Sequence, residues 1–172
     1  MTKNQESIVS SATYGGCGCL FLLMCIGVIA ALALPSLLNS SNKSKQSEAK
    51  QYLSAMNKVQ QANFVEKSAF ATSIAGLEIG IKTETSNYKY SVITSEEAAF
   101  SYGISQKPEL KNYVGGVFVI PTKTNQPNAA KNKIKTIFIL CETDARGTIK
   151  PAKPIYQNGN IAYGKGTINF MK

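Results

Sequence analysis

The sequence predicts an α+β fold, in which one long N-terminal helix packs on an antiparallel β-sheet head and the first half of the helix spans a membrane. Three observations support this prediction. Residues 19–38 are almost wholly apolar, the helical pattern continues beyond them without a break, and the later part of the chain holds short runs of β-branched and aromatic residues. A helix followed by strands, without alternation between the two, is typical of α+β domains.

Length and composition favour one globular domain plus one extra segment. The chain has 172 residues, of which 44% are hydrophobic and 17% are charged, and this suits a single core. The formal net charge of +9 is compatible with an anionic partner such as nucleic acid, lipid headgroups or polysaccharide, and also with a plain solvated basic surface.

The chain contains no histidine, which excludes histidine acid–base chemistry, Ser-His and Cys-His nucleophiles and histidine metal ligands. The adjacent carboxylates Glu96 and Glu97 would point to different faces of a strand or helix, so they make a poor acid and base pair. We therefore expect no enzyme activity, no catalytic or metal site and no cofactor.

The apolar block predicts a membrane span over residues 17–38, preceded by a short polar leader, residues 1–16. A helix rises ~1.5 Å per residue, so a block of this length covers roughly 30 Å, the thickness of the hydrocarbon core. It is longer than the apolar region of a removable secretory signal, although the small residues before Pro35 leave cleavage near that position as a second interpretation. Pro35 itself predicts a kink or local melting of the helix.

The helical pattern continues over residues 39–75 as an amphipathic segment, and no glycine or proline interrupts residues 36–72. Lysines and glutamates occupy one side, so the opposite side is expected to lie on a globular head. The side expected to be buried recurs at steps of three and four residues, and it comprises Ala49, Tyr52, Leu53, Met56, Val59, Gln60, Asn63 and Phe64.

Residues 76–172 predict the β-rich head. Tyr88, Tyr90 and Val92 alternate with polar residues, as in a strand with one buried face. Two stronger runs, VGGVFVIP (residues 114–121) and KIKTIFILCE (residues 133–142), are expected to be antiparallel neighbours on which the helix packs. A last short strand is expected around residues 167–171.

Five segments, taken in order, carry a family resemblance. They are the helix over residues 26–74 and the head segments GIKTETSNYKYSVIT (80–94), LKNYVGGVFVIP (110–121), FILCETDARGT (138–148) and QNGNIAYGKGT (157–167). Together they resemble the type IV pilin-like proteins of the cyanobacterial G/H group. The resemblance implies a minor pilin or pseudopilin of a type IV pilus or a related secretion system, serving filament assembly, motility, adhesion or DNA uptake. The alternative is an uncleaved, single-pass membrane-anchored binding module with a periplasmic head.

The resemblance also implies partners and candidate assembly residues. The protruding helix would anchor the protein in the membrane and later pack against other pilin subunits in a filament built by the pilus assembly machinery. Small residues permit close helix approach, although they are common in any membrane helix. The candidate assembly residues are Gly27, Ala30, Ala31, Ala33 and Pro35.

The leader departs from the family pattern. Pilins carry a glycine at which the leader is cut and, a few residues on, a glutamate; with Gly27 and Pro35 aligned, these two positions hold Thr13 and Gly18. We therefore expect most of the protein to keep its leader and to remain in the inner membrane, with entry into an extracellular pilus rare or confined to its base. Lysines after the span would place the head in the cytoplasm, whereas the resemblance implies a periplasmic head, which we adopt.

The cysteines offer little chemistry. Cys17, Cys19 and Cys25 lie at or within the predicted span, where thiols are inert or become lipidated, and a lipoprotein signal ending at Cys25 fits poorly because the large Met24 precedes it. Cys141 is expected to be a buried thiol. Related pilins close a loop with a disulfide, but the partner position here holds Tyr163.

Lysines dominate residues 107–135 of the head, where Glu109 is the only acidic residue. We expect weak, sequence-independent, salt-sensitive binding of a polyanion such as DNA or surface polysaccharide. The residues proposed for this contact are Lys107, Lys111, Lys123, Lys131, Lys133 and Lys135.

Overall fold

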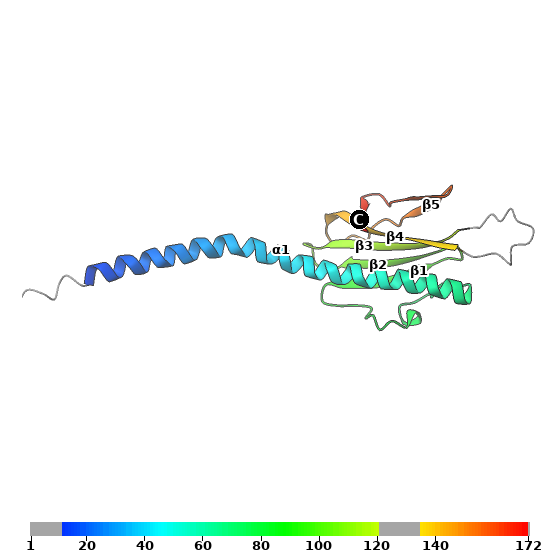
Figure 1. Ribbon diagram of the computed structural model, residues 1–172, viewed down its shortest axis with the longest axis horizontal. Coiled ribbons are helices and arrows are strands. Elements are labelled where there is room, and N and C mark those ends of the chain that lie inside the picture. Colours follow the sequence, from blue (N-terminus) through cyan, green and yellow to red (C-terminus); the bar gives the residue numbers. More distant parts are fainter. Residues whose placement is uncertain (1–11, 121–134, 172) are drawn as a thin grey trace, which may run out of the picture. The chain divides into compact units, whose positions relative to one another are not determined.

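The computed structural model describes residues 12–120 and 135–171, with the side chains of most residues between 12 and 36 outside the description. The chain divides into two compact units, Met1–Ser41 and Asn42–Lys172. One helix, α1 (Ala12–Lys67), supplies the described backbone of the first unit and continues into the second (Figure 1). The second unit contains all the strands and is called the head below.

Helix α1 begins earlier than the sequence predicts. Its backbone stays helical across Pro35, so the predicted local melting is wrong. Within the amphipathic segment assigned to residues 39–75, the helix itself ends at Lys67, close to residue 68, where the sequence predicts its end. The chain then enters the left-handed region at Ser68 (φ 53°), whose N–H still donates to the Phe64 carbonyl at 2.9 Å. A residue in this conformation ends a helix.

The chain then folds back on the helix end. Both the N–H and the carbonyl of Ala71 bond to the Gln60 side-chain amide at 2.8 Å, and the rings of Phe64 and Phe70 lie 4.5 Å apart. A short 3₁₀ helix, η1 (Ala75–Leu77), follows before the first strand. These contacts explain why α1 ends although no glycine or proline is present there.

The predicted membrane span receives no support from the described residues. Among the residues that the structure describes, no helix is long and apolar enough to cross a membrane. Most side chains of residues 17–38 lie outside the described part, so the span stays a prediction.

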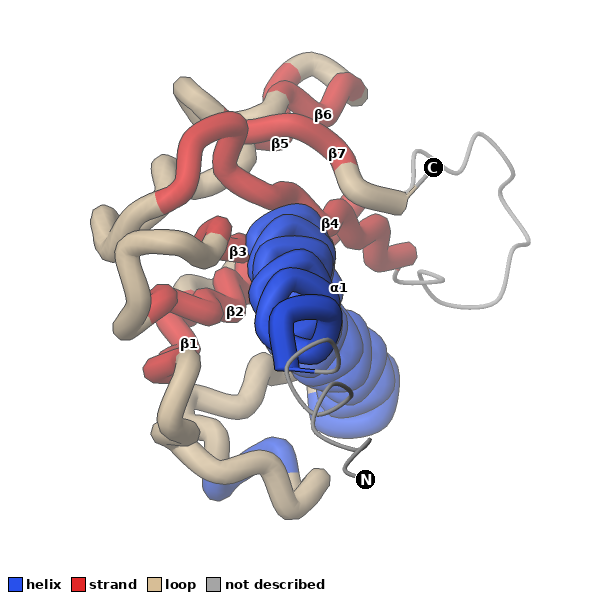
Figure 2. The backbone as a smooth tube through the Cα atoms, turned by 90° about the vertical axis from the view of Figure 1, so that its left-hand side faces the viewer, coloured by secondary structure: helices blue, strands red, loops and turns tan. Residues whose placement is uncertain are grey.

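The main sheet is antiparallel throughout, with the strand order β1-β2-β3-β4-β7. The part of α1 that belongs to the head lies along one face of it (Figure 2). The predicted pairing of the two strongest runs is confirmed, since Val117 of β3 faces Phe138 of β4, and the expected last strand is confirmed as β7. The strands are β1 (Tyr88–Thr94), β2 (Ala98–Ser105), β3 (Lys111–Ile120), β4 (Lys135–Arg146) and β7 (Thr167–Asn169).

Strand β2 and a small hairpin, β5 (Ile155–Gln157) with β6 (Asn160–Ala162), are additions to the sequence prediction. Seven of the eight residues of β2 are buried, because it lies between β1 and β3 with both of its faces covered. A strand buried on both faces lacks the polar and apolar alternation by which strands are recognised in a sequence.

The core of the head has two layers, one on each face of the sheet. On the helix face, Leu53 and Met56 of α1 are fully buried among aromatic side chains of β1 and β3 and Leu140 of β4. On the opposite face, called the outer face below, a cluster containing Phe100, Phe118 and Cys141 is covered by the chain that follows β4.

Candidate functional site

The part of α1 within the head is fixed by a polar contact as well as by apolar packing. Asn57 has no exposed surface, and its Nδ2 atom donates to the Ile139 carbonyl at 3.2 Å. This is feasible because Gly115 faces it: a Cβ built at Gly115 would lie 2.4 Å from Asn57 Nδ2. A glycine inside a strand marks such a close approach. The Asn57–Gly115 contact therefore sets where α1 lies on the sheet.

A charged cluster holds α1 where it enters the head. Lys50 Nζ of α1 lies 2.8 Å from Glu142 Oε2 of β4, and Lys111 Nζ of β3 lies 2.9 Å from Glu142 Oε1. Lys50 Nζ also lies 4.9 Å from the centre of the Phe170 ring. One carboxylate thus joins the helix to two strands, and the cluster Lys50–Glu142–Lys111 is called the entry clamp below.

The entry clamp is charged at neutral pH. Burial acts to raise the pKa of Glu142, but the hydrogen bonds and charges of Lys50 and Lys111 outweigh it and hold that pKa below its usual range. Two further bonds support the same region: Tyr90 Oη donates to Glu48 Oε1 at 3.3 Å, and Tyr113 Oη donates to Gln46 Oε1 at 3.3 Å. The first turns of α1 inside the head therefore make several polar contacts with β1, β3 and β4.

The part of α1 before the head exposes apolar side chains. Met24, Val28, Leu37 and Leu38 are 76%, 62%, 65% and 64% exposed, respectively. Burying such side chains against another apolar surface is worth about 1.5–3 kcal/mol each when complete. Their exposure in the single chain is what a surface for lipid or for another helix requires.

The predicted assembly residues fall in this same part of α1. At Gly27, apart from the two chain neighbours and the backbone of the helix itself, no described atom lies within 4 Å of the position that a Cβ would take. The side chains of Ala30, Ala31, Ala33 and Pro35 lie outside the described residues, as do those of Cys17, Cys19 and Cys25.

The lysines proposed for polyanion binding do not form one patch among the described residues. Lys107 is exposed, whereas Lys111 belongs to the entry clamp. Lys135 stands at the opposite end of the β3–β4 pair from Lys111, since it faces Ile120 while Lys111 faces Arg146; nine steps of about 3.3 Å separate these ends. Lys123, Lys131 and Lys133 lie outside the described residues.

Cys141 has no exposed surface, and burial raises the pKa of its thiol to about 11. A protonated, buried thiol is inert, as the sequence predicts. Tyr163, which the sequence resemblance aligns with a cysteine of related pilins, is 49% exposed. In the part of the chain that the structure describes, no group of three potential metal ligands occurs.

A family model described as type IV pilin-like G and H matches residues 46–164. This interval covers more than half of the chain, and it begins at Gln46, among the polar contacts beside the entry clamp. The chain belongs to the type IV pilin-like G and H family. No curated protein and no solved structure gives a significant match.

The family match distinguishes two parts of α1, because it covers the helix from Gln46 onward and not the residues before it. The matched interval contains the entry clamp, Asn57 and the main-sheet strands β1 to β4, so these features belong to the pilin-like head. Glu142, Lys50 and Asn57 were not recognised as functional from the sequence. The one indication of Asn57's role was the Gly115–Gly116 pair inside a strong strand pattern, which signals a close approach of backbone.

Proposed function

We propose that this pilin-like chain is a minor pilin or pseudopilin, a subunit of a type IV pilus or of a related secretion system. Before assembly it is anchored in the inner membrane by the apolar start of α1, with its head in the periplasm. In the filament, the same helix surface packs against other subunits. It has no catalytic role in this proposal.

The observation that carries the proposal is the difference between the two parts of α1, one buried in the head and one with exposed apolar side chains. From Ala49 onward the helix buries one side in the head, and the entry clamp fixes it there. Before Asn42, the apolar residues Met24, Val28, Leu37 and Leu38 are exposed. Apolar area exposed in this way costs free energy until lipid or another protein surface covers it.

Mechanical shearing of cells tests the proposal. Sheared filaments and washed membranes are probed with an antibody against the head, in cells with and without a working pilus assembly system. We expect most of the chain in membranes and a small share in sheared filaments, the latter only in assembly-competent cells. Absence from filaments and from chemical crosslinks with other pilins would favour the alternative, an anchored binding module.

A pair of variants links the result to α1. Leu37→Asp with Leu38→Asp places charges on the exposed apolar surface, whereas Ser40→Asp with Ser41→Asp places them on neighbouring exposed polar residues. We expect the first pair to lower the filament-to-membrane ratio and the second to leave it near the wild-type value. Equal ratios for the two pairs would show that the apolar surface has no part in assembly.

A further inference from the structure

A proline-fixed segment crosses the outer face of the sheet. Its sequence is KPAKP, residues 150–154, and it is called the KPAKP segment below. Pro151 and Pro154 are buried, and Pro154 occupies the space above Gly116, where a Cβ would lie 2.8 Å from Pro154 Cγ. Proline fixes φ, and both proline rings are buried. The backbone that carries Lys150 and Lys153 therefore has a defined position.

Both lysines of the KPAKP segment lie over aromatic rings of β2. Lys150 Nζ is 4.1 Å from the centre of the Tyr102 ring, and Lys153 Nζ is 5.2 Å from that of Phe100. Phe100 and Tyr102 are two positions apart on one strand, so their rings are spaced by about 7 Å. The segment therefore presents two ammonium groups in a row along β2.

These ammonium groups have no anionic partner in the described part of the chain. The two ion pairs found there both use Glu142, with Lys50 and with Lys111. From Arg146 to the end of the sequence no acid occurs, against the basic residues Arg146, Lys150, Lys153, Lys165 and Lys172. The positive charge at the KPAKP segment is open to an anion from outside.

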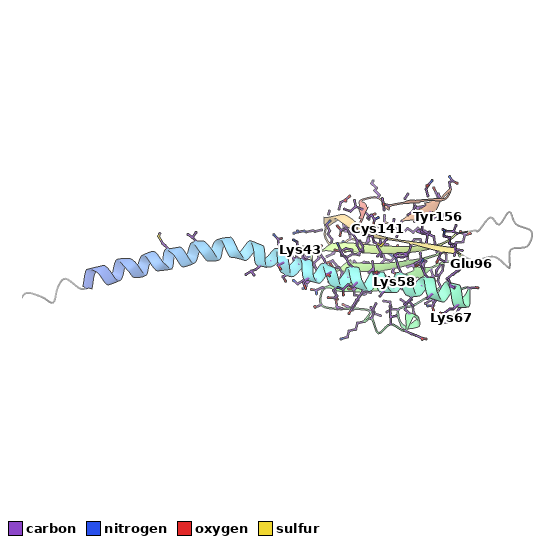
Figure 3. The ribbon with its side chains drawn as sticks, viewed as in Figure 1. Lys43, Lys58, Lys67, Glu96, Cys141 and Tyr156 are labelled. Atoms are coloured by element: carbon purple, nitrogen blue, oxygen red, sulfur yellow. The ribbon has the colours of Figure 1, made fainter. Side chains whose placement is uncertain are left out.

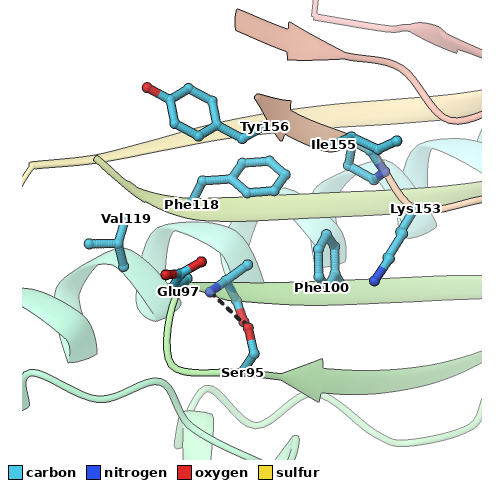
Figure 4. Close-up of a pocket in the computed structure, with 10 residues that line it drawn as sticks. Ser95, Glu97, Phe100, Phe118, Val119, Lys153, Ile155 and Tyr156 are labelled. Carbon is cyan, nitrogen blue, oxygen red and sulfur yellow. Dashed lines mark hydrogen bonds between the residues drawn. The ribbon is translucent and has the colours of Figure 1, made fainter. Parts of the chain in front are cut away.

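A pocket of about 220 Å³ adjoins the KPAKP segment. Lys153, Phe118 and Tyr156 line it, with Ser95 and Glu97 from the turn between β1 and β2 (Figure 4). It is smaller than the roughly 300–1,000 Å³ of sites for drug-sized ligands. Phe118 and Tyr156 supply apolar rings, and Ser95 and Tyr156 supply hydroxyls, a combination that suits one sugar ring, whose faces are apolar and whose edges are hydroxyls. Glu97 in the same lining favours a hydroxyl, and not an anionic group, at this point.

We propose that the outer face of the head binds an acidic polysaccharide. Carboxylates of its uronate units pair with Lys150 and Lys153, and one sugar ring enters the pocket beside Tyr156. The proposal is independent of filament assembly, because every residue it uses belongs to the head. It also moves the polyanion contact away from the lysines that the sequence suggested.

The rings favour a polysaccharide over a nucleic acid. Proteins that bind single strands stack bases on open aromatic rings, but Tyr102 and Phe100 are only 3% and 8% exposed and have ammonium groups above them. Strong duplex binding needs many phosphate contacts, and the KPAKP segment offers two lysines. A sparsely charged, hydroxyl-rich polymer matches both the charge and the pocket.

The test uses the full chain in detergent micelles and polygalacturonate as the probe. Lys150→Met with Lys153→Met removes both charges while keeping apolar chains over the rings, and we expect it to weaken binding about tenfold or more. Lys107→Met with Lys135→Met removes two exposed lysines elsewhere on the head and should change the affinity less than about twofold. Lys150→Arg with Lys153→Arg should retain binding, which separates loss of charge from damage to the fold.

Three results would overturn the proposal. They are no binding of polygalacturonate at low salt, equal weakening by the two methionine pairs, and tighter binding of duplex DNA than of polygalacturonate. Tyr156→Phe checks the pocket: it keeps the ring and removes the hydroxyl, so a loss of affinity with unchanged salt dependence supports a sugar in the pocket. An unchanged affinity would contradict the pocket's part in binding.

Discussion

At the scale of single residues, Gly115 is a position where the head has no room for a side chain. A methyl group there would lie 2.4 Å from the Asn57 amide. We expect Gly115→Ala to destabilise the head by about 1–3 kcal/mol through overpacking, measured by urea unfolding of the full chain in micelles. Adding Asn57→Ala should cost less than the sum of the two single changes, since the methyl then has room.

Gly27→Ala is the matched control for Gly115→Ala. It lies on an open part of α1, and alanine favours a helix by about 1 kcal/mol over glycine. We expect an unchanged or slightly higher stability. A loss at Gly27 equal to that at Gly115 would mean that the effect comes from the backbone, not from the contact with Asn57.

Glu142 gives the head a dependence on pH. Because its folded pKa lies below the unfolded value, its contribution to stability is complete above the usual carboxyl range, about pH 4.3, and is lost as the pH falls through the folded pKa. We expect Glu142→Gln to cost about 1–2 kcal/mol at pH 7, a modest value because Lys50 is 38% exposed.

The decisive measurement for Glu142 is the stability lost between pH 6 and pH 3. The wild-type chain should lose more than Glu142→Gln, which has no carboxylate to protonate in the entry clamp. Glu96→Gln, at an exposed turn position, should behave as the wild type does. Identical losses in all three proteins would contradict the stabilising role of the entry clamp.

At the scale of elements, α1 is held in the head by its buried side. Met56 has no exposed surface, so Met56→Asp would place an unpaired charge in the core. We expect a loss above about 3–4 kcal/mol, seen as a lowered melting temperature of the full chain in micelles. Lys58→Asp, two positions along on the exposed side (Figure 3), should change stability by less than about 0.5 kcal/mol. Similar melting temperatures for the two variants would refute the packing.

Much of the architecture follows from local patterns. The spacing of Leu53, Met56 and Phe64 predicted the buried side of α1, and the β-branched runs predicted β3, β4 and their pairing. Strand β2 was not predicted because its helix face carries small residues, such as Ala99 and Ser101. These give no alternation of polar and apolar residues. The end of α1 depends on the Gln60 bonds to Ala71, which a search for glycine and proline does not detect.

The candidate sites were harder to predict because their members are far apart in the sequence. Lys111 counted as one of six free lysines until its partner Glu142 and the neighbouring Lys50 came together in the fold. Lys150 and Lys153 drew attention only as part of an acid-free tail. Their importance comes from the rings beneath them, and no local pattern connects residues 150–153 with β2.

At the scale of the whole molecule, we expect retention or removal of the leader to determine whether the chain stays in the membrane. The position of the family's cut glycine holds Thr13, so we expect intact-mass analysis of the native protein to show residues 1–16 still attached. Retained Lys3 and Glu6 would have to cross hydrocarbon for the helix to leave the bilayer, at roughly 3 kcal/mol per charge. A mature chain that begins at Cys17 or Cys19, especially with a methylated N-terminus, would contradict this.

The entry clamp also has a mechanical consequence. A tensile load applied along α1 reaches the head through the buried side of the helix and through Lys50, and Glu142 passes part of it to β4 and, through Lys111, to β3. These are the two longest described strands, paired along most of their length, so many hydrogen bonds share the load in shear. Pulling on single molecules should therefore extend the chain in one high-force step for the wild type, and at lower force for Glu142→Gln.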